Sequence, residues 1–509
     1  MILLISTFKN SIFFEDLGLN RISAYLKEYK FSVEVKYLLH GTKIDDSLLG
    51  LFKQALFIGF SVYDNNIDYV LELSKQLRNQ YPNKILFYGS QYISIAYNDI
   101  LDTINDINFL VLGDGEYPLH FFLKEYGSLD FDQIIEKSPH LVSHNSRKNK
   151  FPCYIDINEL PWPEHYNEYM SQSIHADLNT SSGCVGACSF CGSLRRKWSG
   201  RDPQSIVKEI ENIRKQFHIR NFLFADSSFE DPGKSGKKRI NKFLDLLQMT
   251  KEKYAFSANI RAETFKKSDP EDVLLLKKMK NLGFSQLFIG IESGNDKDLK
   301  LYNKRSTVKD NNEIILLLKS CNIMPFWGFI MFNPYSTLES LKTNFLFLQN
   351  HKTYNIYHFI SYLEIFNGSD IYNKIKNDGL IENDGNSGIG FKIIDKEAKR
   401  VYTFIRDYFL DNPIVDNIKI IRDIFHLYYY MLPLIKDLEN NHIIIKTQKI
   451  LCSIGSEYFG DIFQNVLLDK AEKKYNYYKN IIMDCYNELL SVKMAILRKY
   501  YKQFVNNIK

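Results

Sequence analysis

The feature that most constrains the fold is a regular alternation of apolar runs and amphipathic segments over the first 113 residues. The apolar runs predict strands at residues 1–6, 31–38, 56–62, 84–89 and 109–113. Helical spacing of the apolar residues predicts helices at 17–29, 47–54 and 66–79. Strands that alternate with helices of this length form a parallel sheet covered on both faces. We therefore expect a doubly wound, Rossmann-like α/β domain with a ligand crevice at the carboxyl edge of its sheet.

The rest of the chain divides by the same criteria. Residues 138–163 carry four prolines and no periodicity, which is typical of a linker. A second strand–helix alternation begins near residue 174, and beyond about residue 367 the pattern is helical and rich in Tyr, Lys and Ile. The predicted organisation is a first domain at 1–128, a linker at 129–170, a second α/β region at 171–366 and a helical C-terminal substrate or cap region at 367–509.

Composition excludes several functional classes. The 509 residues are 45% hydrophobic and 25% charged, as in ordinary globular proteins. The net charge of +5 is too mild for a typical nucleic-acid-binding surface. The start lacks the charged leader and cleavage site of a signal peptide, and no run reaches the ~20 apolar residues of a membrane span. We expect a cytoplasmic protein with neither nucleic-acid nor membrane partners.

Three of the seven cysteines are crowded into the segment TSSGCVGACSFCG at residues 180–192. Cys184, Cys188 and Cys191 have CxxxCxxC spacing, and Gly186 allows the loop to turn between them. Iron–sulfur cubes usually take four cysteines, so three protein ligands leave one iron open for a substrate. The alternatives are a three-cysteine zinc site or a chance grouping. Zinc sites usually have a fourth Cys or His at short spacing, and none follows Cys191.

At these residues the chain resembles the radical S-adenosylmethionine (SAM) superfamily, and Phe190 between the second and third cysteines is part of the resemblance. The resemblance implies a 4Fe–4S cluster whose open iron chelates the amino and carboxylate groups of SAM. Reduction by one electron then yields methionine and a 5′-deoxyadenosyl radical. It also implies an electron donor such as a reductase, flavodoxin or ferredoxin.

Polar residues at the ends of the later strands extend this resemblance to a partial six-strand (β/α) barrel, since parallel barrels place their sites there. GIESG at 290–294 resembles the fourth-strand motif, which would bring Glu292 and Ser293 to the ribose or methionine part of SAM. Arg261 resembles a third-strand arginine, and Asp226 resembles a second-strand acid that meets the methionine ammonium. The segment 328–334 resembles the one that borders adenine. The alternative for Glu292 and Arg261 is an ordinary ion pair at the barrel rim.

The first domain resembles the cobalamin-binding domains that precede some radical SAM barrels. The matching segments are residues 57–68, 82–92 and 109–123. The resemblance implies a corrin over the sheet edge near Ser61, Asp64, Gly89 and Gly113. Two features depart from the pattern: an Asp-x-His-x-x-Gly motif is absent, and Ser90 stands where a second glycine is usual. The alternative is a doubly wound domain that has lost its cofactor and only caps the barrel.

These resemblances together predict a radical SAM enzyme that uses cobalamin to methylate an unactivated carbon in a natural-product or peptide substrate. The alternative is another radical reaction, such as epimerisation, cyclisation or rearrangement, with a structural or electron-transferring first domain. A regulatory iron–sulfur sensor is a third possibility. We expect the C-terminal region to cover the barrel mouth. Its tyrosine runs at 428–430 and 475–478 are compatible with substrate contact or with helix packing.

Overall fold

The structure is a computed structural model, and it describes residues 1–9, 15–42, 45–170, 173–383, 389–435 and 441–502. Its first part is a six-stranded sheet with the order β2-β1-β3-β4-β5-β6. The strands β1 to β5 run parallel, and β6 pairs antiparallel with β5. Their bounds are β1 Ile2–Phe8, β2 Val33–Leu39, β3 Phe57–Ser61, β4 Ile85–Ser90, β5 Phe109–Leu112 and β6 Leu141–Val142. The predicted doubly wound α/β domain is confirmed.

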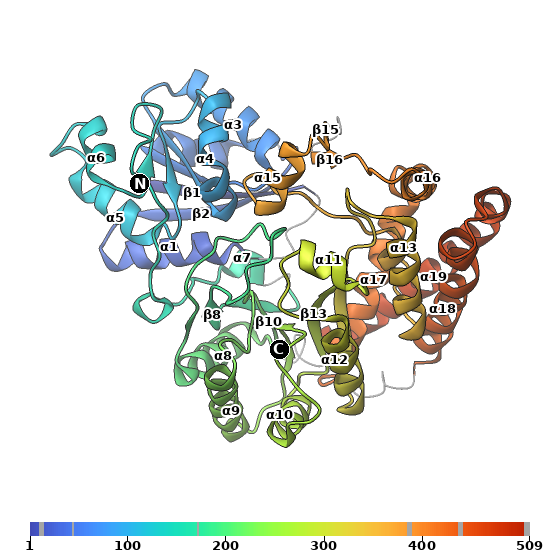
Figure 1. Ribbon diagram of the computed structural model, residues 1–509. Coiled ribbons are helices and arrows are strands. Elements are labelled where there is room, and N and C mark those ends of the chain that lie inside the picture. The colour runs from blue at the N-terminus through green and yellow to red at the C-terminus, as the bar shows by residue number, and fades with distance from the viewer. Residues whose placement is uncertain (10–14, 43–44, 171–172, 384–388, 436–440, 503–509) are drawn as a thin grey trace.

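Helices cover both faces of this sheet and give it two separate hydrophobic cores (Figure 1). One face packs against α2 (Asp46–Gln54), α3 (Ile67–Gln80) and α4 (Gln91–Thr103). The other packs against α1 (Leu17–Glu28), α5 (Glu116–Glu125) and α6 (Phe131–Lys137). The strands are buried on both sides, which is why they read in the sequence as continuous apolar runs rather than as alternating ones.

The segment interpreted as a linker is structured and packs on the first domain. It contains α6 and β6, followed by the short helices η1 (Ile157–Glu159) and α7 (Asn167–Met170). Cys153 forms a β-bridge with Gly113 at the end of β5. A Cβ on Gly113, whose φ is +79°, would lie 2.1 Å from the Cys153 carbonyl oxygen, so this close approach requires glycine. The sequence did not reveal β6 because two residues carry no periodicity.

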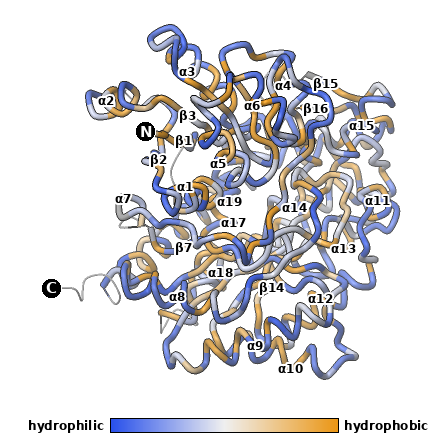
Figure 2. The backbone as a smooth tube through the Cα atoms, turned by 90° about the vertical axis from the view of Figure 1, so that its left-hand side faces the viewer, coloured by the Kyte–Doolittle hydropathy of each residue, from blue (hydrophilic) through white to orange (hydrophobic). Residues whose placement is uncertain are grey.

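The second region forms a curved parallel sheet below the first domain (Figures 1 and 2). Its strands follow one another as β7, β10, β11, β12, β13 and β14, in two hydrogen-bonded groups of three. β11 and β12 are two halves of one extended segment interrupted at Ala258. A bridge between Phe332 and Tyr362 continues the order beyond β14. The bounds are β7 Ala176–Leu178, β10 Asn221–Phe224, β11 Ala255–Ser257, β12 Asn259–Arg261, β13 Gln286–Glu292 and β14 Met324–Phe329.

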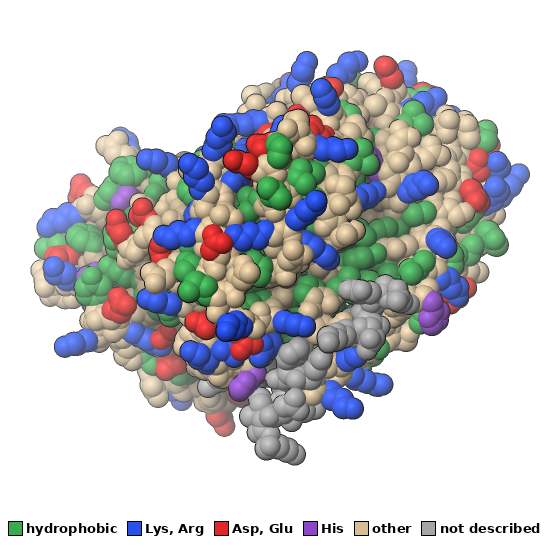
Figure 3. Space-filling view, turned by 90° about the horizontal axis from the view of Figure 1, so that it is seen from below, with side chains coloured by type: hydrophobic (Ala, Val, Ile, Leu, Met, Phe, Trp, Pro, Cys, Tyr) green, Lys and Arg blue, Asp and Glu red, His purple; other side chains and the backbone are tan. Residues whose placement is uncertain are grey.

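Helices between these strands pack on the outside, as the partial-barrel prediction requires. They are α8 Pro203–Phe217, α9 Lys234–Met249, α10 Pro270–Asn281, α11 Asp296–Leu301, α12 Val308–Ser320 and α13 Leu338–Asn350. Their inner faces and the strands form one large apolar core that extends into the C-terminal helices. No helix in the part of the chain described has both the length and the apolar character needed to cross a bilayer. On the face seen in Figure 3, Lys and Arg side chains are interspersed with Asp and Glu.

Only part of the C-terminal region lies at the barrel mouth, where the sequence predicts it. Its first helix, α15 (Asp370–Asn377), lies at the cysteine loop, where the Ile371 amide donates to the Ser189 carbonyl at 2.9 Å. In contrast, α17 (Ile414–Met431) crosses the opposite, amino end of the barrel strands. There Ser285 donates to the Tyr429 carbonyl, and Gln286 lies 2.9 Å from His426. The expectation that this region covers the barrel mouth is therefore wrong for α17, whose apolar face closes the bottom of the core.

The remaining long C-terminal helices lie to one side of the barrel (Figure 1), and the first of them packs near the carboxyl end of β14, where Tyr402 and Phe332 have ring centroids 5.1 Å apart. They are α16 Lys396–Ile405, α18 His442–Phe463 and α19 Leu468–Tyr500. Tyr428, Tyr430, Tyr475 and Tyr478 are buried in the core, whereas Tyr477 is 65% exposed. The buried tyrosines therefore serve helix packing, which was one of the two interpretations left open by the sequence.

Candidate functional site

The cysteine loop follows β8 (Ser181–Ser182) and is fastened on several sides. The Val185 amide donates to Asp231 at 3.0 Å, and the Ser189 amide donates to the Tyr302 carbonyl at 2.9 Å. Asn303 donates to the Ala187 carbonyl at 2.7 Å. The loop conformation is thus fixed by residues at the ends of two later barrel segments.

The three thiols lie on this one loop beside two cationic side chains. A Cβ on Gly186 would stand 3.3 Å from the sulfur of Cys184 and 3.9 Å from that of Cys188, so both sulfurs flank this glycine. Burial raises the pKa of Cys184 to about 11 and also raises that of Cys188. The charges of Arg261 and Lys304 oppose this by favouring the thiolates.

The three thiols suit the corners of an iron–sulfur cube. Among the described residues, no three His, Cys, Asp or Glu side chains are placed to hold one metal ion. A four-iron cube spreads its thiolate ligands farther apart, because each binds a different corner. A glycine-turned loop with three thiols and neighbouring cations provides the donor set that such a cube requires.

A buried ion pair stands inside the barrel next to the cysteine loop. Glu292 ends β13 with a φ of +62°, and its carboxylate lies 3.5 Å from the Lys304 ammonium. Gly290 and Gly328 give these two side chains room, because a Cβ on either would approach the Glu292 carboxylate to within 3.2 Å. Burial alone would lower the pKa of Lys304, but the charges of Glu292 and Cys188 raise it. Lys304 is a site residue that no sequence motif indicated.

Arg261 lies on the other side of the loop, surrounded by carboxylates. It contacts Asp231 at 2.6 Å, Glu263 at 2.8 Å and Glu230 at 3.6 Å. Asp231 also accepts the hydrogen bond from the Val185 amide, so Arg261 and the cysteine loop share this acid. Arg261 and Glu292 thus both lie beside the cysteines. Both also form ion pairs, as the alternative interpretation of ordinary rim ion pairs predicts.

Two other residues predicted to bind SAM have polar side-chain atoms that are hydrogen-bonded to other residues of the protein. Asp226 is buried and accepts hydrogen bonds from the Thr180 and Ser181 amides at 2.7 and 2.9 Å. The Ser293 hydroxyl lies 3.0 Å from Asp298 and 2.8 Å from Asn344, on the outer side of the strand. Their geometry indicates that Asp226 positions the start of the cysteine loop and that Ser293 joins β13 to the outer helices. Phe190 packs edge-on against Tyr302 at 5.5 Å.

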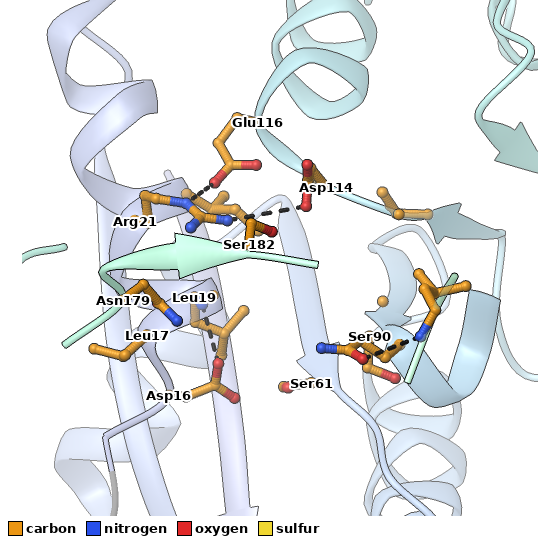
Figure 4. Close-up of a pocket in the computed structure, with 18 of the residues that line it drawn as sticks. Asp16, Leu17, Leu19, Arg21, Ser61, Ser90, Asp114, Glu116, Asn179 and Ser182 are labelled. Atoms are coloured by element: carbon orange, nitrogen blue, oxygen red, sulfur yellow. Dashed lines mark hydrogen bonds and ion pairs between the residues drawn. The ribbon is translucent and has the colours of Figure 1, made fainter. Parts of the chain in front are cut away.

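A cavity of about 480 Å³ separates the carboxyl edge of the first sheet from the barrel (Figure 4). Ser61, Gly89 and Gly113 line it, as predicted. Asp64 does not line it and instead borders a neighbouring cavity of about 450 Å³. The barrel side is formed by residues before and after the cysteine loop, including Asp177, Asn179, Ser182, Leu194 and Arg196.

Ser90, the departure from the glycine pattern, is used locally. Its hydroxyl donates to the Val62 carbonyl and accepts from the Ile93 amide at 3.0 Å, which caps α4. The side chain is therefore held against the end of the sheet (Figure 4). At the position where a glycine is usual, the serine side chain thus serves as the N-cap of α4.

The cavity has a charged wall that joins the two domains. Arg21 donates to Glu116 at 2.6 Å, and Arg196 donates to Asp114 at 2.7 Å. One carboxylate oxygen of Glu116 is buried without a hydrogen-bond partner among the described residues. Arg196 comes from the barrel region and Asp114 from the first domain, so this contact fixes the width of the cavity.

A second buried charge cluster sits behind the same wall. His165 lies 2.8 Å from Glu15 and 3.7 Å from Glu209, and the Glu15 amide donates to Asp177 at 2.9 Å. Burial raises the pKa of Asp177 to about 7. No sequence pattern marks this cluster, because its members come from three distant segments and meet only in the folded chain.

Comparison with known proteins shows what part of this chain resembles a known family. Residues 178–348 match the family model of the radical SAM superfamily. The anaerobic magnesium-protoporphyrin IX monomethyl ester cyclase of Cereibacter sphaeroides is 25% identical over 52% of this chain and 44% of its own length. The 4′-phospho-dehydrooxetanocin synthase of Priestia megaterium is 26% identical over 66% of this chain and 48% of its own length. The matches thus span about half the length of these relatives.

Two solved structures resemble the fold over most of the chain. The cobalamin-dependent SAM radical enzyme OxsB superposes on 100% of this chain and 81% of its own, with a TM-score of 0.72 and 19% identity. The radical SAM methyltransferase TsrM from Kitasatospora setae covers 77% of this chain and 82% of its own, with a TM-score of 0.60 and 15% identity. Together with the cysteine loop, the family model identifies residues 178–348 as a radical SAM domain, the kind of domain that works with a 4Fe–4S cluster and SAM, and the solved structures show that the chain shares the fold of OxsB.

Proposed function

We propose that this enzyme also binds cobalamin and transfers a methyl group to an unactivated carbon of a small-molecule or peptide substrate. The observation that carries the proposal is the cavity between the carboxyl edge of the first sheet and the barrel. Ligands of doubly wound folds bind at this edge. The solved structures of OxsB and TsrM contain bound cobalamin, and both folds resemble this one.

The residues around the cavity suit a large ligand with amide groups. Gly89 and Gly113 place no side chain over the ends of β4 and β5. The described residues near Ser61 offer no histidine to the cavity, so a cobalt there would have no imidazole ligand from this chain.

The chain's own residues bring the two reaction centres together. The bound cluster and cobalamin supply the reductive cleavage of SAM and the carriage of a methyl group. Leu194 and Arg196, three and five residues after Cys191, line the cavity, so the cysteine loop and the corrin site share a wall. Such proximity shortens the path between the carbon that loses hydrogen and the methyl donor.

Binding of cobalamin is tested with anaerobically reconstituted protein that is mixed with hydroxocobalamin and gel filtered. A Cβ on Gly89 would make only ordinary contact, 3.5 Å from Val111, so Gly89→Ala should retain corrin. Gly89→Phe should fill the cavity and lose corrin while retaining about four irons. If the unsubstituted protein retains no corrin and turnover is indifferent to cobalamin, the proposal fails.

The second candidate is a radical cyclisation or rearrangement without methyl transfer. It is favoured by the names of the cyclase and the synthase among the relatives. SAM with a deuterated methyl group distinguishes the two on substrates from neighbouring genes. A product that carries the deuterated methyl supports methylation, and an altered product without it supports the second candidate.

The proposed partners are an external electron donor for the cluster and the substrate, with no nucleic acid and no membrane surface.

A further inference from the structure

A second cavity, of about 510 Å³, lies on the outer side of the barrel, away from the cysteine loop. It is bounded by the first half of β14, the chain that follows α13, and α18. Met324 to Trp327 form the β14 side, whereas Glu292 pairs with Phe329 at the other end of this strand. The cavity is thus separate from the site described above, and its occupant need not be a cofactor of the radical reaction.

The walls of this cavity carry positive charge without acidic residues. Lys319, Lys352 and Lys449 line it, and its lining contains neither Asp nor Glu. None of the three lysines forms a salt bridge among the described residues. Lys446, one turn before Lys449 on α18, is by contrast paired with Glu488 at 2.6 Å. All three cavity lysines are exposed.

The lysines are close enough to disfavour one another's charge. Lys319 donates to the His351 carbonyl at 3.4 Å, which is a weak contact at a neutral acceptor. Burial lowers the pKa of Lys319, Cys452 raises it, and the charge of Lys352 lowers it. Burial also lowers the pKa of His351 to about 4 and that of His358 to about 3, so both imidazoles are neutral at pH 7. An anion between the lysines would relieve this repulsion.

The remaining wall is aromatic and offers one unused donor. Trp327 is 7% exposed and stacks on His358 with ring centroids 5.4 Å apart. Its indole nitrogen has no hydrogen-bond partner among the described residues. Phe326 and Tyr354 add half-buried rings. The aromatic rings thus give this part of the wall an apolar surface.

We propose that this cavity is a binding site for a small phosphorylated aromatic molecule, with its phosphate among Lys319, Lys352 and Lys449 and its ring against the aromatic wall. Lysine is a point-charge ligand for phosphate, and the rings supply the apolar surface that a planar group buries. Such a ligand joins α18 to β14 and so ties the C-terminal helices to the barrel.

Trp327 makes the site directly observable. The chain has 3 tryptophans, so replacing Trp162 and Trp198 with Phe leaves Trp327 as the single indole reporter. Phenyl phosphate and AMP are titrated into the full-length anaerobic holoenzyme while fluorescence is recorded. We expect saturable quenching with a Kd of about 1 mM or tighter for at least one of them. Phenol and inorganic phosphate should each bind at least about tenfold more weakly, because each lacks one half of the recognition.

Charge variants locate the binding. Lys352→Glu and Lys449→Glu should each weaken phenyl phosphate by about tenfold or more. The matched control is Lys473→Glu on the exposed face of α19, which should leave the affinity unchanged. Calorimetric titration of the natural sequence, which needs no tryptophan replacement, should give the same affinities.

Three results would overturn the inference. They are the absence of saturable binding of both probes by fluorescence and calorimetry, binding of phenol as tight as that of phenyl phosphate, and unchanged affinity in both lysine variants.

Discussion

Replacing Glu292 with Gln tests the buried ion pair beside the cysteine loop. The variant keeps the shape of the side chain but leaves the Lys304 ammonium, 7% exposed, without its carboxylate at 3.5 Å. Breaking a buried pair by removing one partner costs about 3–5 kcal/mol. Lysine can limit this cost by losing its proton, and neutralising a lysine of ordinary pKa at pH 7 costs about 4.6 kcal/mol. We therefore expect a loss of about 3–4.6 kcal/mol.

The assay is thermal unfolding of the anaerobic holoenzyme, followed by circular dichroism, for Glu292→Gln, Lys304→Met and the double variant. At about 2–4 °C per kcal/mol for a domain of this size, Glu292→Gln should lower Tm by about 6–18 °C. The double variant should be more stable than the sum of the single losses predicts, by about 2 kcal/mol or more, because it leaves no unpaired buried charge.

Lys446→Met, which removes an exposed pair with Glu488, serves as the control and should leave Tm unchanged. Losses at Glu292 and Lys304 that add to within about 0.5 kcal/mol would refute the reasoning, because they would show that the two charges do not depend on each other. Iron content should stay near four per chain in Glu292→Gln, since the cysteines are untouched.

Three further predictions follow from the site. Ala at Cys184, Cys188 or Cys191 should abolish both the cluster and SAM cleavage, measured as bound iron and released 5′-deoxyadenosine, whereas Ala at Cys321, Cys452 or Cys485 should leave bound iron unchanged. Arg261→Ala and Glu292→Ala should each weaken SAM about ten- to a hundredfold by equilibrium binding, through loss of a charged contact, and unchanged affinity in both would show that they are structural only. Burial alone would lower the pKa of His165, but the charges of Glu15 and Glu209 raise it to about 10. The protonated imidazole therefore contributes its full stabilisation to the fold below about pH 6.5, and this contribution is lost as the pH rises through 10. The fall of Tm between pH 7 and 10 should therefore be shallower in His165→Gln, and an unaltered slope would contradict the ion-pair assignment.

The sequence by itself determined the local elements of this protein. Apolar runs such as residues 56–62 indicate strands buried on both faces. A central strand of a parallel sheet is covered by helices on both sides, so none of its side chains has to be polar. The spacing of Cys184, Cys188 and Cys191 likewise needs only a single loop, so it could be read without knowing the fold. Ser61, Gly89 and Gly113 were found because parallel strands end at one common edge.

Tertiary structure decided which side chains meet and which way they point. Asp226 and Ser293 follow strands, as barrel site residues do, yet their polar atoms are engaged by Thr180 and Asn344. Lys304 lies in an ordinary polar stretch and becomes a site residue only because its ammonium turns into the barrel towards Glu292. The spacing of apolar residues predicts that α17 has an apolar face. It does not predict which end of the barrel that face covers. The spacing of apolar residues in the sequence shows which side chains are buried. Which side chains meet, and which way each one points, depends on contacts between residues far apart in the chain, and these contacts exist only in the folded protein.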